Sequence, residues 1–538
     1  MEPLIPNTAE LLAILPEIIL VVAMCVALIV PVLPPFRATC RSSHGAMLTI
    51  AVAGLLGALV AALAMLGGRF GLSVPDAHVM ANMLAVDRFA LTFKVILYLF
   101  TLLVIGLWVS VTRNEVRPPD GPDYVTLILG GVLGMSLMAS ATNFLMIFLA
   151  IESASFPSYA LAGFRKSTRR ASEASMKYVL FGSASSAFML YGLSMAYGAY
   201  GTLDLSTLAL SVADSGMSVG LMLGLFGFLI GVGFKLSAVP VHFWCPDVFE
   251  GASFEITTFL SVASKGAAIA LLLRVMTTFG FFAPPSSEGM LIGIGSFVGL
   301  IGAVTATWGN LAAYFQTNVK RLLAYSSIAH AGYMIMAAGL LTASLNHRAP
   351  QELAYAILFY LIVYAFMNLG AFTIAAVVAA DRDGDESLDA FNGLAMRSPM
   401  LAIAFGVLLM SLFGMPLTGG FWGKVRLGFE MWNEQMWWLV LILVINTVFS
   451  LYFYLKPIIV MVWKPAPTTS AARVPGIAAA IVAIAVLGVA ATGLFPDPTT
   501  RWAESNAVLG YFPDREPPIT APVDEAVDET AFITAPEQ

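Results

Sequence analysis

Several ionisable side chains lie deep inside long apolar segments, where a charged group is costly. Glu152 stands about nine residues from either end of the segment 144–164, which places it roughly 13 Å deep if the segment is a helix. A charge at that depth costs at least about 2.5 kcal/mol, so such a residue faces other helices and usually marks a route for ions or protons. A structural ion pair is the alternative interpretation of Glu152.

Three lysines occupy comparable positions. Lys265 lies near the middle of the apolar segment 254–279, while Lys235 and Lys424 each stand beside a break rich in Pro and Gly. Free backbone carbonyls and water at such breaks can receive an ammonium group. Burial lowers the pKa of lysines in general and a nearby carboxylate raises it again, so a buried lysine can exchange protons near neutral pH. One buried lysine can be accidental, but three favour a proton relay.

Two polar clusters resemble known binding motifs without matching them. The segment 419–424 ends in Gly-Lys like a phosphate loop, but Thr418 replaces the first glycine and Val425 replaces the Ser or Thr that would bind magnesium. Beside the first break, three further residues have a spacing that fits no common metal site: His242, Cys245 and Asp247. The three cysteines of the chain also lack the spacing of cluster ligands. We therefore expect no cofactor and no metal in this chain.

The composition identifies the elements that must position these residues. Of the 538 residues, 59% are hydrophobic and only 11% are charged, whereas soluble domains carry roughly 25% charged residues. The net charge is -6 and no basic patch with interleaved aromatic residues is present, so a nucleic-acid partner is not expected. Most of the chain must instead face the lipid bilayer or other apolar helices.

The apolar segments predict an all-α membrane protein with about 14 transmembrane helices, because about 20 apolar residues cross the hydrocarbon core. The expected spans are 11–34, 46–66, 88–110, 123–141, 144–164, 173–198, 218–240, 254–279, 289–310, 322–343, 352–380, 399–424, 435–460 and 475–495. Basic residues such as Lys166 and Arg321 gather in loops on one side, which the positive-inside rule makes cytoplasmic. Both termini are then periplasmic, including the acidic tail 513–538, whose composition is typical of disorder.

The sequence also contains an internal repeat. A pattern beginning at Leu180 recurs 178 residues later at Leu358, with five spans between the copies. An odd number of spans per repeat requires opposite orientations in the membrane, and inverted repeats place working sites where broken helices meet near the midplane. Each half contains one apolar segment broken by Pro or Gly, 221–250 and 401–432. The same offset maps Glu152 onto His330, which adds a second titratable group to the candidate relay.

Four long stretches carry a family resemblance: Phe234 to Gly251, Phe259 to Lys265, Asn318 to Tyr333 and Gly414 to Lys424. They resemble the antiporter-like membrane subunits of complex I, the proton-pumping NADH:quinone oxidoreductase, and most closely subunit N. The resemblance covers the chain from Leu15 to Pro496 and implies a 14-helix fold with two inverted five-helix repeats. It also implies that Glu152 and Lys235 form the charged pair of the first half-channel, that Lys265 connects to the centre and that Lys424 governs the second half.

The resemblance further implies a proton-translocating subunit of the bacterial inner membrane, driven by quinone reduction in neighbouring subunits. Quinone, FMN and iron-sulfur clusters then belong to partner subunits. The expected partners of this chain are other membrane subunits of complex I, especially neighbouring antiporter-like and small membrane subunits. The expected division is 1–122 for N-terminal helices, 123–279 and 280–460 for the repeats, 461–512 for a C-terminal helix and 513–538 for the tail. A subunit of an Mrp-type cation/proton antiporter or membrane-bound hydrogenase is one alternative, and a purely structural membrane anchor is another.

One stretch departs from the family pattern. After Gly251 the family usually has Pro-Thr-Pro-Val, whereas this chain has Ala-Ser-Phe-Glu-Ile at 252–256. Glu255 either starts the following helix, since an acid in the first turn contributes about 0.3–1 kcal/mol, or takes up protons at the cytoplasmic mouth. For Lys320, in a basic pair at the start of a later span, proton supply and interfacial anchoring are the two interpretations.

Overall fold

The structure is a computed structural model that describes residues 8–33, 45–68, 77–112, 120–166, 168–282, 288–343, 349–466 and 470–507. The predicted tail 513–538 lies outside these residues. The N-terminal part contains α1 (Thr8–Ala13), α2 (Leu15–Ile29), α4 (Gly45–Leu66), the antiparallel strands β1 (Ala77–Val79) and β2 (Leu84–Val86), and α5 (Arg88–Leu107), which continues into the π-helical turn η2 (Trp108–Thr112).

The segments predicted to form the two repeats follow in chain order. The first contains α6 (Gly121–Ser140), α7 (Phe144–Ala162), α8 (Arg169–Tyr200), α9 (Leu205–Ser215), α10 (Val219–Leu236), α11 (Trp244–Gly251), α12 (Phe254–Phe259), the π-helical turn η5 (Leu260–Ser264) and α13 (Lys265–Phe282). The second contains α14 (Glu288–Ala313), α15 (Val319–Ala343), α16 (Ala349–Asp381), η7 (Leu388–Phe391), α17 (Leu394–Arg397), α18 (Pro399–Phe413), α19 (Gly419–Asn433) and α20 (Trp437–Trp463). The described chain ends with α21 (Gly476–Leu494) and α22 (Pro496–Asn506).

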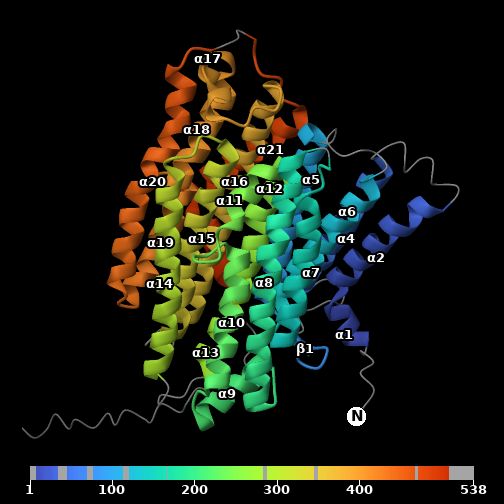
Figure 1. The fold of residues 1–538 in the computed structure, drawn as a ribbon, viewed down its shortest axis with the longest axis vertical. Helices are drawn as coiled ribbons and strands as arrows, with labels where there is room; N and C mark the ends of the chain where they lie inside the picture. The colour runs from blue at the N-terminus through green and yellow to red at the C-terminus, as the bar shows by residue number, and fades with distance from the viewer. Residues whose placement is uncertain are drawn as a thin grey trace, which may run out of the picture.

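Most helices run roughly along the long axis of the molecule (Figure 1). The blue N-terminal helices α2 and α4 lie at one edge of this view and the orange α20 lies at the other, with α8, α10 and α15 between them. Twelve helices in the described part are long and apolar enough to span a membrane. The two remaining predicted spans correspond to α15, which carries polar residues, and to the short apolar α18 before the second break. The predicted all-α membrane fold is therefore confirmed.

Both predicted breaks are present. The helix α10 ends at Leu236 and is followed by Ser237, whose φ of 56° is left-handed, and the chain then turns before α11. The helix α18 ends at Phe413 and is followed by Gly414, whose φ of 93° favours glycine because side chains with a Cβ atom rarely adopt this conformation. Each break leaves backbone groups without helical partners, and membrane proteins tolerate such groups only where protein or water covers them.

Two buried ion pairs tie the N-terminal helices together and to the first repeat. Arg274 of α13 contacts Asp87 through two hydrogen bonds of 2.9 and 3.0 Å, and Asp87 also caps α5. Lys94 of α5 lies 2.7 Å from Glu17 of α2. All four side chains are nearly inaccessible to solvent, so loss of one partner would leave an uncompensated charge in an apolar surrounding.

The helices α14 and α15 pack through glycines spaced seven residues apart, Gly302 and Gly309 in α14 and Gly332 and Gly339 in α15. A Cβ atom added at Gly332 would lie 2.4 Å from a backbone nitrogen of α14, and one added at Gly309 would lie 2.6 Å from a backbone nitrogen of α15. Small residues allow this approach between membrane helices, where van der Waals packing drives association. The backbone of α15 is therefore held directly against that of α14.

Candidate proton relay

Lys235 lies in the last turn of α10, beside the first break. Its side chain is fully buried and its Nζ atom has no hydrogen-bond partner among the described residues. Glu152, in the middle of α7, is half-buried and accepts a hydrogen bond from the Ser186 hydroxyl of α8. The carboxylate lies within electrostatic reach of Lys235 without touching it. Any coupling between the two in this structure is therefore through space.

Lys265 begins α13 directly after the π-helical turn η5, a type of turn that is frequent at functional sites. The side chain is 1% exposed, so its expected burial is confirmed. Its Nζ atom donates a 2.7 Å hydrogen bond to the Ser327 hydroxyl of α15 and lies 3.8 Å from the sulfur of Cys245. A lysine on α13 is thereby connected to a hydroxyl on α15.

His330 of α15 lies between two tyrosine hydroxyls. Its Nδ1 atom is 2.6 Å from the hydroxyl of Tyr360 on α16, and its Nε2 atom is 3.1 Å from the hydroxyl of Tyr454 on α20. The Tyr454 hydroxyl is also 2.5 Å from the hydroxyl of Ser326. All four side chains are buried, so both ring nitrogens of His330 belong to a closed chain of hydrogen bonds.

Lys424 of α19 reaches back across the second break. Its Nζ atom donates a 2.7 Å hydrogen bond to the carbonyl of Phe413, the last residue of α18, and lies 5.1 Å from the centroid of the Tyr333 ring. A Cβ atom at Gly414 would lie 3.1 Å from Cδ of Lys424, so the glycine leaves room for the lysine stem. The expectation that a freed carbonyl receives an ammonium group is confirmed here, whereas Lys235 has no such partner.

One stripe of α15 connects these groups. Ser327, His330 and Tyr333 recur every three residues and therefore lie on one side of the helix. Ser327 meets Lys265, His330 meets the two tyrosines, and Tyr333 meets Lys424. Both lysines lie within electrostatic reach of His330. The second repeat thus provides a row of titratable and hydroxyl groups between two buried lysines.

Lys320 lies at the start of α15 and is 1% exposed, so it does not extend into an open interface. Its Nζ atom lies 2.5 Å from a carboxylate oxygen of Glu386 and donates a 2.9 Å hydrogen bond to the carbonyl of Ala252. The Glu386 side chain is 16% exposed. This ion pair links the interior beside the start of α12 to the surface of the loop between α16 and η7.

Glu255 lies in the first turn of α12, as expected for an acid that starts a helix. It is 1% exposed, and one carboxylate oxygen accepts hydrogen bonds from the hydroxyls of Tyr124 at 2.7 Å and Ser253 at 2.5 Å. Tyr124 and neighbouring helices cover the carboxylate, and the position at the cytoplasmic mouth stays a prediction. A role at the start of α12 fits this geometry better than direct proton uptake from water.

The sequence did not identify the hydroxyl groups that bind Lys265 and His330. Tyr360, Tyr454 and Ser327 stand in apolar spans, where a buried hydroxyl needs a hydrogen-bond partner. This general rule was the available signal, but it does not say which group is the partner. In the ranges that the structure describes, no three His, Cys, Asp or Glu side chains are grouped as metal ligands.

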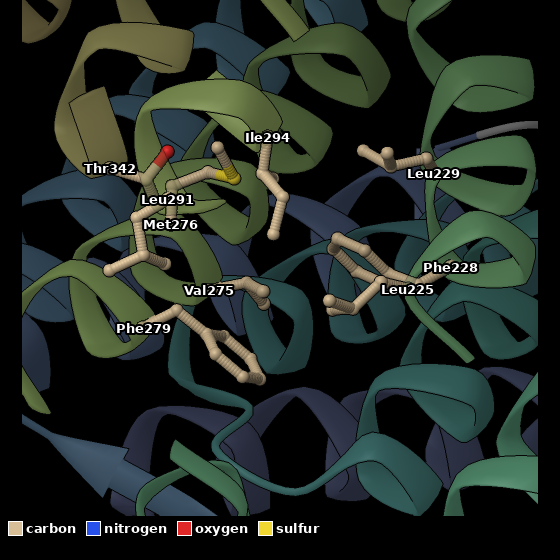
Figure 2. A pocket seen from close by; sticks show the side chains of 9 residues that line it. All are labelled: Leu225, Phe228, Leu229, Val275, Met276, Phe279, Leu291, Ile294 and Thr342. Carbon is tan, nitrogen blue, oxygen red and sulfur yellow. The ribbon is translucent and has the colours of Figure 1, made fainter. Parts of the chain in front are cut away.

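Figure 2 shows a small cavity among α10, α13, α14 and α15, with Phe228, Val275 and Ile294 among its lining residues. Its volume is about 20 Å³, enough for roughly one water molecule. Thr342 supplies the only hydroxyl in its lining. The cavity contains none of the relay residues and is a packing feature.

Comparisons with known proteins agree with this architecture. A sequence model of the family described as "NADH:quinone oxidoreductase/Mrp antiporter, TM" matches residues 141–450. NADH-quinone oxidoreductase subunit N of Anaeromyxobacter sp. (strain Fw109-5) is 39% identical over 490 residues, covering 85% of this chain and 91% of the relative. NADH-quinone oxidoreductase subunit N 1 of Solibacter usitatus (strain Ellin6076) is 33% identical over 511 residues, covering 93% and 98%.

Solved structures give the same fold. A chain of respiratory complex I from Thermus thermophilus with bound aureothin is 31% identical, with a TM-score of 0.70 and coverage of 90% of this chain and 98% of that chain. A chain of the Mrp complex from Dietzia sp. DQ12-45-1b has a TM-score of 0.76, covering 94% and 98%, at 19% identity. The second likeness shows the fold alone.

Proposed function

The chain belongs to the NADH:quinone oxidoreductase/Mrp antiporter family, and we propose that it is the subunit N type of membrane subunit, which carries protons across the membrane. The observation that carries this proposal is the buried row of side chains on α15. The row contains His330 and lies between Lys265 of α13 and Lys424 of α19. Buried ion pairs such as Arg274 with Asp87 can serve structure alone, but a structural anchor has no need of Lys265 and Lys424, which form no ion pair among the described residues.

The row contains two hydrogen-bonded groups, Lys265 with Ser327 and His330 with Tyr360 and Tyr454, and proton exchange between these groups requires a side-chain rotation or an intervening water. A hydroxyl accepts one hydrogen bond while it donates another, so Ser327, Tyr360 and Tyr454 can pass a proton on without a permanent charge. Lys265 and Lys424 hold the charge at the two ends, since a buried lysine can be neutral or charged near working pH. His330 lies between them as the intermediate acceptor and donor.

The first half-channel consists of Glu152 and Lys235. The carboxylate favours the charged form of the lysine, and water carries the proton across the space between them. The ion pair of Lys320 and Glu386 forms the uptake side, because Glu386 reaches solvent while Lys320 reaches the interior. Glu255 supports α12 beside this pair.

Quinone reduction in neighbouring subunits drives the transfer, so quinone, FMN and iron-sulfur clusters reside in partner subunits. The partners are neighbouring antiporter-like and small membrane subunits of one complex in a bacterial inner membrane. The loops that carry Lys166 and Lys464 face the cytoplasm. An Mrp-type antiporter subunit is the second candidate, favoured by the shared fold; co-purification of quinone- and nucleotide-binding subunits separates the two.

The central test uses Lys235→Ala and Glu152→Ala in the assembled complex, reconstituted into proteoliposomes. We expect proton pumping per electron to fall about tenfold or more in each variant, the scale of losing a proton-transfer group, while the subunits still co-purify. Acidification is measured with a pH-sensitive dye alongside quinone reduction. The exposed Lys166→Ala is the control, and normal pumping by both variants would remove the first half-channel from the pathway.

Lys424→Arg tests the second half in the same assay. A guanidinium remains charged at working pH, so it can keep the contact with the Phe413 carbonyl but cannot release a proton. We expect this variant to assemble and to lose pumping, whereas wild-type pumping would exclude Lys424 from the relay.

A further inference from the structure

An apolar groove opens on the outer surface between α5, α16 and α21 and ends at α22. Its volume is about 770 Å³. Leu99 of α5 and Ile484 of α21 line it and are 46% and 42% exposed, so the groove is open to the surroundings of the protein. Ile362 and Phe366 of α16 and Trp502 of α22 also line it.

Close contacts border this groove. A Cβ atom at Gly106 of α5 would lie 3.2 Å from the side chain of Ile481 on α21, so these two helices meet just beyond the groove. A Cβ atom at Gly488 of α21 would lie 2.7 Å from the ring of Phe366, so α21 also lies directly against α16. The groove is therefore a defined space between three packed helices.

The size of the groove distinguishes its possible occupants. A spanning helix about 30 Å long and 10 Å wide occupies roughly 2,400 Å³, about three times the available volume. An acyl chain of about 16 carbons takes roughly 480 Å³, if each carbon occupies about the 30 Å³ of one water molecule. The groove thus has room for one complete acyl chain and part of a second, whereas a partner helix would lie mostly outside it.

A charged group lies near the α22 end of the groove. Tyr355, Phe359, Ile362 and Phe366 share one face of α16, because they are spaced by four, three and four residues. The Arg426 guanidinium lies 4.3 Å from the centroid of the Phe359 ring, one helical turn from the groove residue Ile362. Its Nη1 atom is buried and has no hydrogen-bond partner among the described residues.

Two acids of α22, Asp497 and Glu504, lie within electrostatic reach of Arg426. The end of the groove therefore has the Arg426 guanidinium beside two carboxylates. A zwitterionic headgroup such as phosphatidylethanolamine matches both signs, since its phosphate suits a guanidinium and its ammonium suits a carboxylate. A purely anionic headgroup would pair with Arg426 but would leave the two acids without a cation.

We propose that this groove binds one zwitterionic phospholipid, with an acyl chain between α5 and α16, its phosphate on Arg426 and its ammonium toward the acids of α22. Trp502 lies where the tail meets the headgroup, a position that tryptophan favours in membranes. The proposal is independent of the proton relay, because none of the relay residues lines the groove.

The test places the assembled complex in nanodiscs that contain phosphatidylethanolamine with a photoactivatable acyl chain. After dilution with unlabelled lipid and illumination, mass spectrometry locates the adducts. We expect the segments 95–103 and 362–369 to keep their label after the surface of α8 around Phe188 and Tyr191 has exchanged it. Exchange at equal rates, or absence of label in the groove, would overturn the proposal.

Two variants sharpen the result. Ala365→Phe fills part of the groove and should displace the lipid, whereas Ala483→Phe makes the same change on the exposed surface of α21 and should leave the label unchanged. Arg426→Gln should speed lipid exchange about tenfold, the loss of one charge-assisted hydrogen bond. Retention of label in Ala365→Phe, its displacement by an isoprenoid quinone alone, or crosslinks from the groove to a neighbouring subunit would each contradict the proposal.

Discussion

A neutral histidine ring has one N–H group and one bare nitrogen, so it donates to one partner and accepts from the other. For His330 these partners are the hydroxyls of Tyr360 and Tyr454. One tyrosine therefore donates toward the ring while the other receives the ring N–H. Exchange of the two tautomers reverses the polarity of the hydrogen-bond chain, which continues to Ser326. In the proposed relay, His330 sets the direction in which a proton can pass.

Tyr360→Phe and Tyr454→Phe test this role, because each removes one hydroxyl and keeps the ring. We expect pumping to fall about tenfold or more. Stability should fall by about 1–3 kcal/mol, since a buried nitrogen of His330 loses its partner. Tyr314→Phe is the matched control, because its hydroxyl binds the carbonyl of Phe449 away from the α15 stripe. Wild-type pumping in both relay variants would show that the tyrosines only support packing.

Glu255→Gln separates the two roles considered for Glu255. Glutamine keeps an oxygen that can accept from Tyr124 and Ser253 but removes the negative charge near the start of α12. We expect a stability loss of about 1 kcal/mol and unchanged pumping, measured by thermal unfolding of the complex and by acidification from pH 6 to 9. A pumping deficit confined to alkaline pH would instead support proton uptake at this residue.

At the scale of elements, the pair of Arg274 and Asp87 joins α13 to α5. Arg274→Met leaves Asp87 buried without its partner, so we expect a loss of about 3–5 kcal/mol in stability. Adding Asp87→Asn should recover part of this loss, because the double variant contains no unpaired charge and the amide can still cap α5. Thermal unfolding of the complex measures both effects. The exposed Arg169→Met should change stability by less than about 0.5 kcal/mol.

Equal stability of Arg274→Met and wild type would show that α5 and α13 are held together by their apolar contacts alone. A double variant less stable than Arg274→Met would show that the Asp87 carboxylate has another essential partner. One such partner is Ala90, whose backbone N–H donates a hydrogen bond to the Asp87 carboxylate at the start of α5.

The broken helices could be predicted because Pro and Gly in an apolar segment leave few other conformations. The burial of Lys265 and Lys424 followed from their apolar surroundings. The partners of His330 could not be predicted, since Tyr360 and Tyr454 lie 30 and 124 residues away in sequence and meet it only through helix packing. The covered position of Glu255 was missed for the same reason, because Tyr124 comes from α6.

At the scale of the whole molecule, orientation in the membrane can be tested with α20, whose ends lie near Gln435 and Lys464. We expect Lys464→Cys to react with an impermeant maleimide only in inverted vesicles, and Gln435→Cys only in spheroplasts. The native cysteines are first replaced by serine. Labelling from the opposite sides would invert the proposed topology.

The predicted repeat divides the chain into two halves whose lysines have different partners at the breaks. Lys424 has a carbonyl at its break, whereas Lys235 has no hydrogen-bond partner among the described residues. The sequence offset pairs Glu152 with His330 but does not show this difference, because it arises from the chain around each break. The division into 1–122, 123–279, 280–460, 461–512 and 513–538 stays a prediction.

The glycine contacts between α14 and α15 have a mechanical consequence. Backbones that touch cannot slide or rotate past each other without opening a gap. The helix α15 is therefore fixed against α14, and it holds Ser327 and His330 in constant positions along its axis. In the proposed pumping cycle, motion would then be confined to side-chain torsions and to the chain at the breaks beside α11 and α19. In the proposed relay, a local rearrangement at one lysine would then alter proton access while Ser327 and His330 stay in place.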